Sequence, residues 1–433
     1  MRNLLLVCFL FLNYAVGFSQ QGIRTIKTIN LSPTTDNQLV KGELPYQDML
    51  PFFSYFIECP EGETGLKIRF SKDNTSWTKW TVMQRETHNM EKYITLLYYG
   101  EVNYKYYELS IEQLEASESA ILLHFFNPGK TKENTHSNNT NTLAADKDLL
   151  ACPCPMPEFE GRNDWCSTSD CPEHPNPSFT PVSHLIVHHS AGSNSSSDWA
   201  ATVRAIWDYH VNGNGWSDIG YNWLIDPNGV IYQGRGDNTL GAHFCGTNSQ
   251  TMGVCMMGTF TTVTPTEVAI TSLEKLLGWK SCDRDIAPLA SSFHPSSGLT
   301  LHNISGHRDG CNTECPGNSF YPLLPSVRQG VVDYIESSCT AVSTSQLDLA
   351  GDLLRISPNP ARNQLSIRFE SELDGEMQWQ LVNLYQQAVA QWTSSKNTAV
   401  FTDKISIESL PMGIYFLHLE INGQKGVWKI IKG

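Results

Sequence analysis

"HLIVHHSAG", residues 184–192, is the stretch that decides the fold of the central part of this chain. Its apolar, β-branched run is typical of a buried strand, and the strand carries His188 near its end. Far downstream, "GHRDGCNTECPG" at residues 306–317 places His307 eight positions before Cys315. Two imidazoles and a thiolate supply three zinc ligands, and a catalytic site leaves the fourth tetrahedral position to water. The three side chains therefore predict a catalytic zinc site rather than a structural one.

The segments around this strand alternate between strand and helix patterns. Further strands are predicted in "YNWLI", "VIYQG" and "GVCMMG". A helix is predicted in "SSSDWAATVRAIWDYHVN" with Ser197 as its cap, and a second helix begins at a capping box of Thr264 and Glu267. The inward residues of the second helix are Ala269, Leu273, Leu276 and Leu277, and those of a last helix are Leu324, Val327, Val331 and Ile335. The pattern predicts an α/β domain with a mixed sheet and flanking helices.

Length and charge limit the classes of protein. At 433 residues the chain is long enough for two or three domains, each with its own core. The net charge of -14 argues against a nucleic-acid partner, which requires a basic surface. We predict a multidomain protein in which all-β sandwich domains lie on both sides of the central domain. The predicted ranges are a signal peptide at 1–20, a sandwich at 21–128, a linker at 129–150, the central domain at 151–340, a linker at 341–352 and a C-terminal domain at 353–433.

The first residues resemble a secretory leader, with a basic start, an apolar run from Leu4 to Val16 and small residues before the cleavage point. The alternative is a membrane anchor, but the run is shorter than the ~20 residues that a bilayer crossing needs. We therefore expect an exported protein with no membrane span in its mature form. In the N-terminal sandwich, Trp77 and Trp80 are either core residues or a platform for glycan binding.

The cysteines agree with export. Cys8 lies in the leader and Cys315 is a predicted ligand, which leaves an even number of the 12 cysteines to pair. Four of them, Cys152, Cys154, Cys166 and Cys171, form either disulfides or a zinc site, and their spacing favours disulfides. A disulfide between Cys311 and Cys315 is the alternative to a metal ligand at Cys315.

Four motifs, "HLIVHHSAG", "GWSDIGYNWLIDPNGVIYQGRG", "GAHFCGTNSQTMGVCMMG" and "GHRDGCNTECPG", carry a family resemblance. In this order they resemble the peptidoglycan recognition proteins and T7 lysozyme, the type 2 N-acetylmuramoyl-L-alanine amidases, over residues 181–330. The resemblance implies a Zn²⁺ enzyme that cuts the amide bond between the lactyl group of N-acetylmuramic acid and L-alanine. Peptidoglycan is then the substrate, and the alternative is a recognition protein that binds peptidoglycan without cutting it. Non-catalytic relatives typically lack the ligand cysteine, which this chain has.

The resemblance also assigns roles to residues. It implies that His188, His307 and Cys315 bind the metal and that Tyr221 and Thr313 are catalytic. His243, Asn248 and Arg235 are assigned to the substrate groove, while His189 and His210 are expected to be structural. The leaving amine takes its proton from Tyr221 or a water on it, with Glu314 as the alternative. Asp237 stands where animal relatives often have tryptophan, which leaves the stem-peptide type open.

The C-terminal segment carries a second resemblance. "LRISPNPARNQLSIRF" and the final "SIESLPMGIYFLHLEINGQKGVWKIIKG" resemble the sorting domain of the type IX secretion system, although a carbohydrate-binding sandwich is an alternative. The type IX machinery is therefore an expected partner, and the protein is expected at the cell surface or outside the cell, as a monomer.

Overall fold

The computed structural model describes residues 22–31, 37–45, 51–59, 65–86, 93–101, 103–112, 120–131, 154–167, 170–339, 354–383, 388–422 and 424–433. The predicted leader, most of both predicted linkers and Cys152 lie outside these ranges. The chain divides into two compact units. Within the described ranges, we find no helix with the length and apolar character that a membrane crossing requires.

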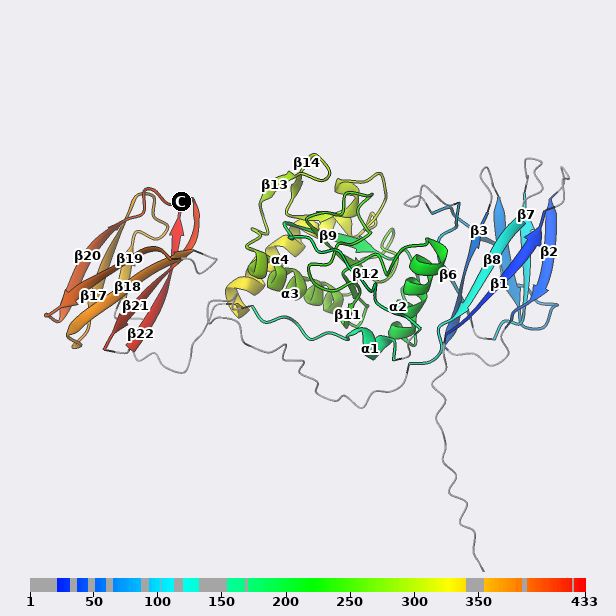
Figure 1. Ribbon diagram of the computed structural model, residues 1–433, viewed down its shortest axis with the longest axis horizontal. Helices are drawn as coiled ribbons and strands as arrows, with labels where there is room; N and C mark the ends of the chain where they lie inside the picture. Colours follow the sequence, from blue (N-terminus) through cyan, green and yellow to red (C-terminus); the bar gives the residue numbers. More distant parts are fainter. Residues whose placement is uncertain are drawn as a thin grey trace, which may run out of the picture. The chain divides into compact units, whose positions relative to one another are not determined.

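The N-terminal region consists of two antiparallel four-stranded sheets (Figure 1). One has the order β1-β8-β3-β6 and the other the order β2-β7-β4-β5. Their bounds are β1 (Ile23–Asn30), β2 (Gln38–Glu43), β3 (Phe52–Glu58), β4 (Leu66–Ser71), β5 (Thr81–Val82), β6 (Tyr98–Glu101), β7 (Tyr106–Ile111) and β8 (Ala120–Asn127). Ile57 and Phe125 of the first sheet and Ile68 and Leu109 of the second belong to one buried cluster. The two sheets therefore share a core, in agreement with the predicted all-β domain.

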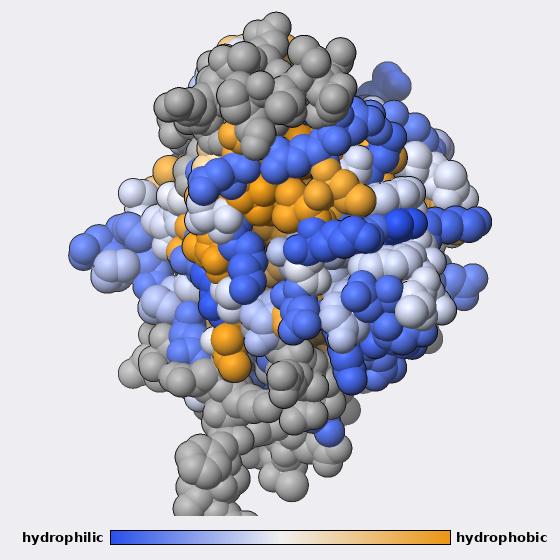
Figure 2. Space-filling view, turned by 90° about the vertical axis from the view of Figure 1, so that its right-hand side faces the viewer, coloured by the Kyte–Doolittle hydropathy of each residue, from blue (hydrophilic) through white to orange (hydrophobic). Residues whose placement is uncertain are grey.

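One face of this region keeps apolar side chains in solvent. Leu39 on β2 and Val82 on β5 are at least half exposed. The view onto this end of the molecule shows hydrophobic surface between long hydrophilic side chains (Figure 2). The rings of Trp77 and Trp80 both lie against the guanidinium of Arg69, at 5.1 and 4.4 Å. Both rings thus already form a cation–π contact with a side chain of the protein itself.

The same compact unit contains helices α1 (Arg162–Trp165) and α2 (Trp199–Asp208) and the π-helix η1 (Tyr209–Gly213). The predicted cap of α2 at Ser197 is wrong by one residue, because the Asp198 carboxylate accepts the hydrogen bond from the Ala201 amide at 2.9 Å. Every residue of α2 is buried. The Tyr209 hydroxyl, just beyond α2, donates to the carbonyl of Thr95 in the β region at 2.8 Å.

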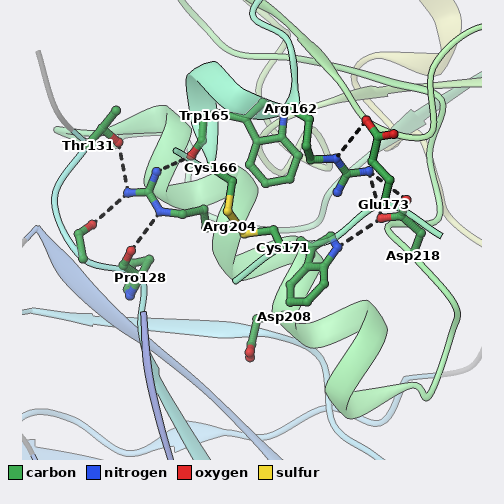
Figure 3. The surroundings of a disulfide bond; sticks show 12 residues. Pro128, Thr131, Arg162, Trp165, Cys166, Cys171, Glu173, Arg204, Asp208 and Asp218 are labelled. Carbon is green, nitrogen blue, oxygen red and sulfur yellow. Dashed lines mark hydrogen bonds and ion pairs between the residues drawn. A yellow bond between two sulfur atoms is a disulfide. The ribbon is translucent and has the colours of Figure 1, made fainter. Parts of the chain in front are cut away.

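Arg204 joins α2 to the segment that leaves β8 (Figure 3). Its Nε donates to the carbonyl of Pro128 at 2.8 Å and its Nη2 to that of Gly129 at 2.9 Å. Arg24 on β1 forms an ion pair with Asp208 at the end of α2. The compact unit therefore includes α1 and α2 together with the N-terminal sheets.

A second buried arginine, Arg162, forms an ion pair with Asp218 (Figure 3). Arg162 Nη2 lies 2.9 and 2.7 Å from the two oxygens of Asp218. The Asp218 carboxylate also accepts hydrogen bonds from Trp207 Nε1 at 3.0 Å and from the Ile219 amide at 2.7 Å. Several donors thus compensate the desolvation of this carboxylate.

The second unit contains a five-stranded mixed sheet with the order β11-β10-β12-β9-β15. Its strands are β9 (His184–His189), β10 (Trp223–Ile225), β11 (Ile231–Gln233), β12 (Thr251–Met256) and β15 (Ile304–Gly306). All neighbouring pairs are parallel except β10 and β11, which are antiparallel. The predicted strands "LIVHH", "YNWLI" and "GVCMMG" thus belong to one sheet, and the predicted mixed α/β arrangement is confirmed.

Helices α3 (Glu267–Arg284) and α4 (Leu324–Ser338) share a buried core with one face of this sheet. The predicted inward residues of α3 and three of the four in α4 are buried, while Ile335 is partly buried. The predicted capping box is wrong, because Thr266 is the N-cap and accepts from the Ala269 amide at 3.2 Å. The remaining short elements are β13 (Ser291–His294), β14 (Leu299–His302), η2 (His307–Asp309) and η3 (Tyr321–Leu323).

The regular elements in the described part of the C-terminal region are all strands (Figure 1). Its sheets have the orders β16-β17-β20 and β19-β18-β21-β22. The strands are β16 (Leu354–Ser357), β17 (Gln364–Glu370), β18 (Gly375–Asn383), β19 (Ala388–Lys396), β20 (Val400–Ser406), β21 (Gly413–Ile421) and β22 (Gln424–Lys432). Ile367 and Phe369 of the first sheet and Trp379 and Leu417 of the second lie in one buried cluster. The predicted all-β character of this region is confirmed.

Disulfides join Cys154 to Cys339, Cys166 to Cys171 and Cys245 to Cys311. These pairs exclude a zinc site made of Cys154, Cys166 and Cys171, so the preference for disulfides at these three cysteines is confirmed. Not all the cysteines that could pair do so, because Cys59 and Cys255 form no disulfide.

Candidate metal centre

Strand β9 presents His188 on one defined face of the central sheet. Side chains alternate along a strand, and Leu185 and Val187 belong to the core shared with α3 and α4. Ile186 packs in a separate cluster with Phe244 and Leu301. His188 therefore points to the same side as Ile186, away from these helices.

The structure brings the three predicted metal ligands together. One potential ligand atom from each of His188, His307 and Cys315 lies within 4.8 Å of the others, and all three residues are buried. His188 Nδ1 is 3.8 Å from Cys315 Sγ, and the two imidazole centroids are 4.5 Å apart. Zinc–nitrogen and zinc–sulphur bonds in tetrahedral geometry place the two donors about 3.6 Å apart. The donor types and their spacing fit a zinc ion.

A chain of hydrogen bonds fixes the orientation of His188. Its Nε2 lies 3.0 Å from His243 Nδ1, and His243 Nε2 lies 3.3 Å from Thr251 Oγ1. The Thr251 hydroxyl donates to the carbonyl of Asn248 at 2.8 Å. Because that carbonyl can only accept, we assign each N–H or O–H in the chain as pointing away from His188 Nδ1. The Nδ1 lone pair of His188 is then left for a metal.

His243 and Asn248 both belong to the hydrogen-bond network beside His188. His243 is buried behind His188, and burial together with the nearby charge of Arg235 lowers its pKa to about 3. A neutral ring at this position can accept the hydrogen bond from His188 Nε2–H at any physiological pH. The Asn248 side-chain oxygen accepts from the amides of His243 and Phe244 at 2.7 and 2.8 Å, which holds the loop in place.

The backbone supports the Cys315 sulphur. The amide of His189 donates to Cys315 Sγ at 3.2 Å, a hydrogen bond that stabilises a thiolate. The His189 ring instead accepts from the Phe260 amide at 3.3 Å, and the His210 ring accepts from the Gly220 amide at 3.0 Å. These two bonds agree with the structural roles expected for both histidines.

The loop between the last two ligands is tied to a neighbouring segment. Cys311, four residues after His307, is bonded to Cys245, two residues after His243. The alternative disulfide between Cys311 and Cys315 is therefore wrong, and Cys315 keeps its thiol. No local pattern predicts this pairing, because Cys245 and Cys311 are 66 residues apart.

The two predicted catalytic side chains lie close to the ligands. The ring centroid of Tyr221 is 5.3 Å from that of His188, and its hydroxyl hydrogen-bonds the buried Cys255 thiol. Burial, chiefly, raises the pKa of Cys255, which keeps it a neutral thiol. The Thr313 hydroxyl accepts from the Cys315 amide at 3.2 Å. Cys255, which the sequence analysis did not single out, pairs with His188 across two parallel strands.

The structure also describes the surroundings of Arg235, Glu314 and Asp237. The Arg235 guanidinium donates to the carbonyl of Leu240 at 2.8 Å, and Glu314 is exposed. Asp237 forms an ion pair with Lys280, a fully buried side chain that also donates to Asp283 at 2.8 Å. The Asp237 carboxylate is thus held by a buried cation, although about a third of its side chain is exposed.

Comparisons with protein families match two parts of the chain. The family model described as N-acetylmuramoyl-L-alanine amidase matches residues 178–318, which contain all eight predicted site residues. The model described as a secretion system C-terminal sorting domain matches residues 355–433.

Individual relatives match the same central region. The chain is 36% identical to peptidoglycan-recognition protein SC2 of Drosophila simulans over 142 residues, 32% of this chain and 71% of that protein. It is 35% identical to N-acetylmuramoyl-L-alanine amidase of Homo sapiens over 148 residues, 33% of this chain but only 24% of that protein. A solved structure of wild-type Drosophila PGRP-LB is similar with 28% identity and a TM-score of 0.33, and the match covers 39% of this chain and 93% of that one.

Proposed function

Since the chain belongs to the family of peptidoglycan recognition proteins and N-acetylmuramoyl-L-alanine amidases, we propose that it is a zinc-dependent amidase. Its reaction is hydrolysis of the bond between the lactyl group of N-acetylmuramic acid and L-alanine in peptidoglycan. The observation that carries the proposal is the convergence of His188, His307 and Cys315 within 4.8 Å. Recognition of peptidoglycan without cleavage would not require three oriented ligands.

The proposal gives each group around the ligands a task. His188 and His307 would bind the metal as neutral imidazoles and Cys315 as a thiolate. A zinc ion held by these residues would supply Lewis acidity for an amide carbonyl and for the attacking water. The ring centroids of Tyr221 and His188 are 5.3 Å apart. From this position the Tyr221 hydroxyl would donate a hydrogen bond to the oxyanion that develops on the substrate. Tyr221, or a water on it, also remains our candidate to deliver the proton to the leaving amine.

Groove contacts are assigned only where the side chains can still turn to a substrate. Arg235 is half-buried and lies close enough to His243 for its charge to act on that ring. Because part of its side chain reaches solvent, its guanidinium can bind the carboxylates of a stem peptide. Thr313 is likewise half-buried beside Cys315 and offers a hydroxyl. Asp237 is held by Lys280 and is therefore not proposed as a determinant of stem-peptide type.

Export fits this substrate. The C-terminal sorting domain belongs to the type IX secretion system and directs the protein to the cell surface or the extracellular space. Peptidoglycan of the producing cell would then lie on the other side of the outer membrane. We propose that the target is foreign peptidoglycan or released wall fragments.

The proposal is tested with purified sacculi and the full-length protein, with and without a zinc chelator. Free stem peptides that begin with L-alanine, identified by mass spectrometry, are expected only when zinc is present. Cys315→Ser should bind the same sacculi without releasing peptides. If the zinc-loaded protein sediments with sacculi and releases nothing, the chain is a recognition protein.

A further inference from the structure

A second set of potential metal ligands adjoins the proposed centre. Cys245, His307 and Cys311 also offer one ligand atom each within 4.8 Å of one another. His307 Nε2 lies 3.7 Å from Cys245 Sγ, close to the donor spacing of about 3.6 Å in a tetrahedral zinc site. In the structure Cys245 and Cys311 are joined in a disulfide, and disulfide sulphurs are not thiolate ligands.

We propose that reduction of this disulfide opens a second metal site at Cys245, His307 and Cys311, which competes with the proposed catalytic centre. Two thiols of a reductant transfer two electrons to the sulphur–sulphur bond and become a disulfide, while Cys245 and Cys311 become thiols. Both thiols lose their protons when they bind a metal ion. The inference rests on the proposed function, since it assumes that His188, His307 and Cys315 bind zinc.

The two sites compete because they share His307. A neutral imidazole has one lone pair, so it binds one ion at a time. The second site supplies two thiolates, which neutralise both charges of Zn²⁺, whereas the centre at His188 supplies one. Thiolates are softer ligands than imidazoles, so a site with two thiolates is expected to bind zinc more tightly than a site with one. A zinc ion whose charge is fully neutralised by its ligands is a weaker Lewis acid. The reduced protein would thus hold its metal in a less active position.

The disulfide is placed where a reductant can reach it. Cys245 is exposed and Cys311 is half-buried, whereas the three ligands of the proposed centre are buried. Thiols persist in the cytoplasm and disulfides form in exported proteins. Oxidation during export would remove the second site and leave His307 to the centre with His188 and Cys315. Assembly of the active centre would thereby depend on leaving the cytoplasm.

The test counts thiolate ligands with cobalt(II) in the metal-free full-length protein. Oxidised protein is expected to show the thiolate-to-cobalt charge-transfer band of one sulphur ligand, and anaerobic reduction should raise that absorbance about twofold. The oxidised Cys315→Ser protein should show no such band, and the band should appear when this variant is reduced. Removing the second site with C245S/C311S should abolish the response to reduction. The matched control C166S/C171S removes a different disulfide and should retain it.

The outcomes separate the inference from the function on which it rests. If oxidised wild-type protein binds no cobalt through sulphur, the proposed catalytic centre is wrong. If it shows a one-sulphur band that reduction leaves unchanged, or if reduced Cys315→Ser shows no band, the second site is wrong and the catalytic centre stands. Circular dichroism of each variant before and after reduction checks that its fold is retained.

Discussion

Two buried polar clusters of this protein are built on opposite principles. Around α1 and α2, Arg162 meets Asp218 and Arg24 meets Asp208, so each cation lies against an anion. At the end of β9, His188, His307 and Cys315 bring three electron-pair donors together. The first arrangement lowers its own electrostatic energy. The second gains most when a cation lies among the donors, and this difference separates a structural network from a candidate site.

The largest expected effect comes from removing a donor in the second cluster. Cys315→Ser should lower amidase activity roughly 1,000-fold or more, because several kcal/mol of transition-state stabilisation depend on the metal. Zinc content, measured by mass spectrometry of the metal, should fall in parallel while the thermal transition of the metal-free protein stays unchanged. An equal loss of fold and zinc would make Cys315 part of a structural network after all.

In the first cluster the large effect should be on stability instead. Arg162→Ala leaves the Asp218 carboxylate buried without its cation and should cost about 3–5 kcal/mol of unfolding free energy, measured by denaturant titration. The control is Arg368→Ala, which breaks an exposed pair with Glu370 and should change stability by less than about 1 kcal/mol. Loss of zinc affinity in folded Arg162→Ala would contradict the separation of the two clusters.

Tyr221→Phe tests whether a group beside the donors acts in the reaction rather than in metal binding. Removing one oxyanion donor should lower kcat about 100 to 1,000-fold with zinc content unchanged. Tyr232→Phe is the control, because its hydroxyl donates to Asp226 at 3.0 Å and belongs to no proposed step. Unchanged kcat in Tyr221→Phe would leave the tyrosine a packing residue.

Asp208 is the carboxylate of the first cluster that is least compensated, since its Oδ2 lacks a hydrogen-bond partner among the described residues. Burial raises its pKa from 3.8 to about 6 despite Arg24. The Asp208 carboxyl therefore binds a proton more tightly in the folded protein than in the unfolded chain. The resulting stability is complete below pH 4 and is lost as the pH rises through about 6, about 3 kcal/mol in all. Asp208→Asn should flatten this part of a stability curve measured from pH 4 to 7.

The smallest effect is expected from a change at His243, which hydrogen-bonds the proposed ligand His188. His243→Ala removes the acceptor for His188 Nε2 and should weaken zinc binding about 10- to 100-fold in competition with a chromophoric chelator. His302→Ala, an exposed histidine on β14, should leave the affinity unchanged. If both variants bind zinc like the wild type, the hydrogen-bond chain does not orient His188.

Local patterns predicted the parts of the fold that depend on neighbouring residues. The apolar run before His188 predicted β9, and the periodic residues of α3 predicted its buried face. Helix starts were misplaced by one or two residues because several side chains near each start can accept the capping bond, and geometry decides among them. The role of His243 and the pairing of Cys245 depend on segments far apart in sequence, for which periodicity carries no information.

The disulfide between Cys154 and Cys339 closes a loop of 185 residues around most of the central region. A pulling force applied to the chain before Cys154 and after Cys339 would be carried by one covalent bond instead of by the sheet and helices inside the loop. For a force that enters and leaves outside the loop, the disulfide is a mechanical bypass. The metal centre lies inside the loop and would stay unloaded while the rest of the chain is under tension.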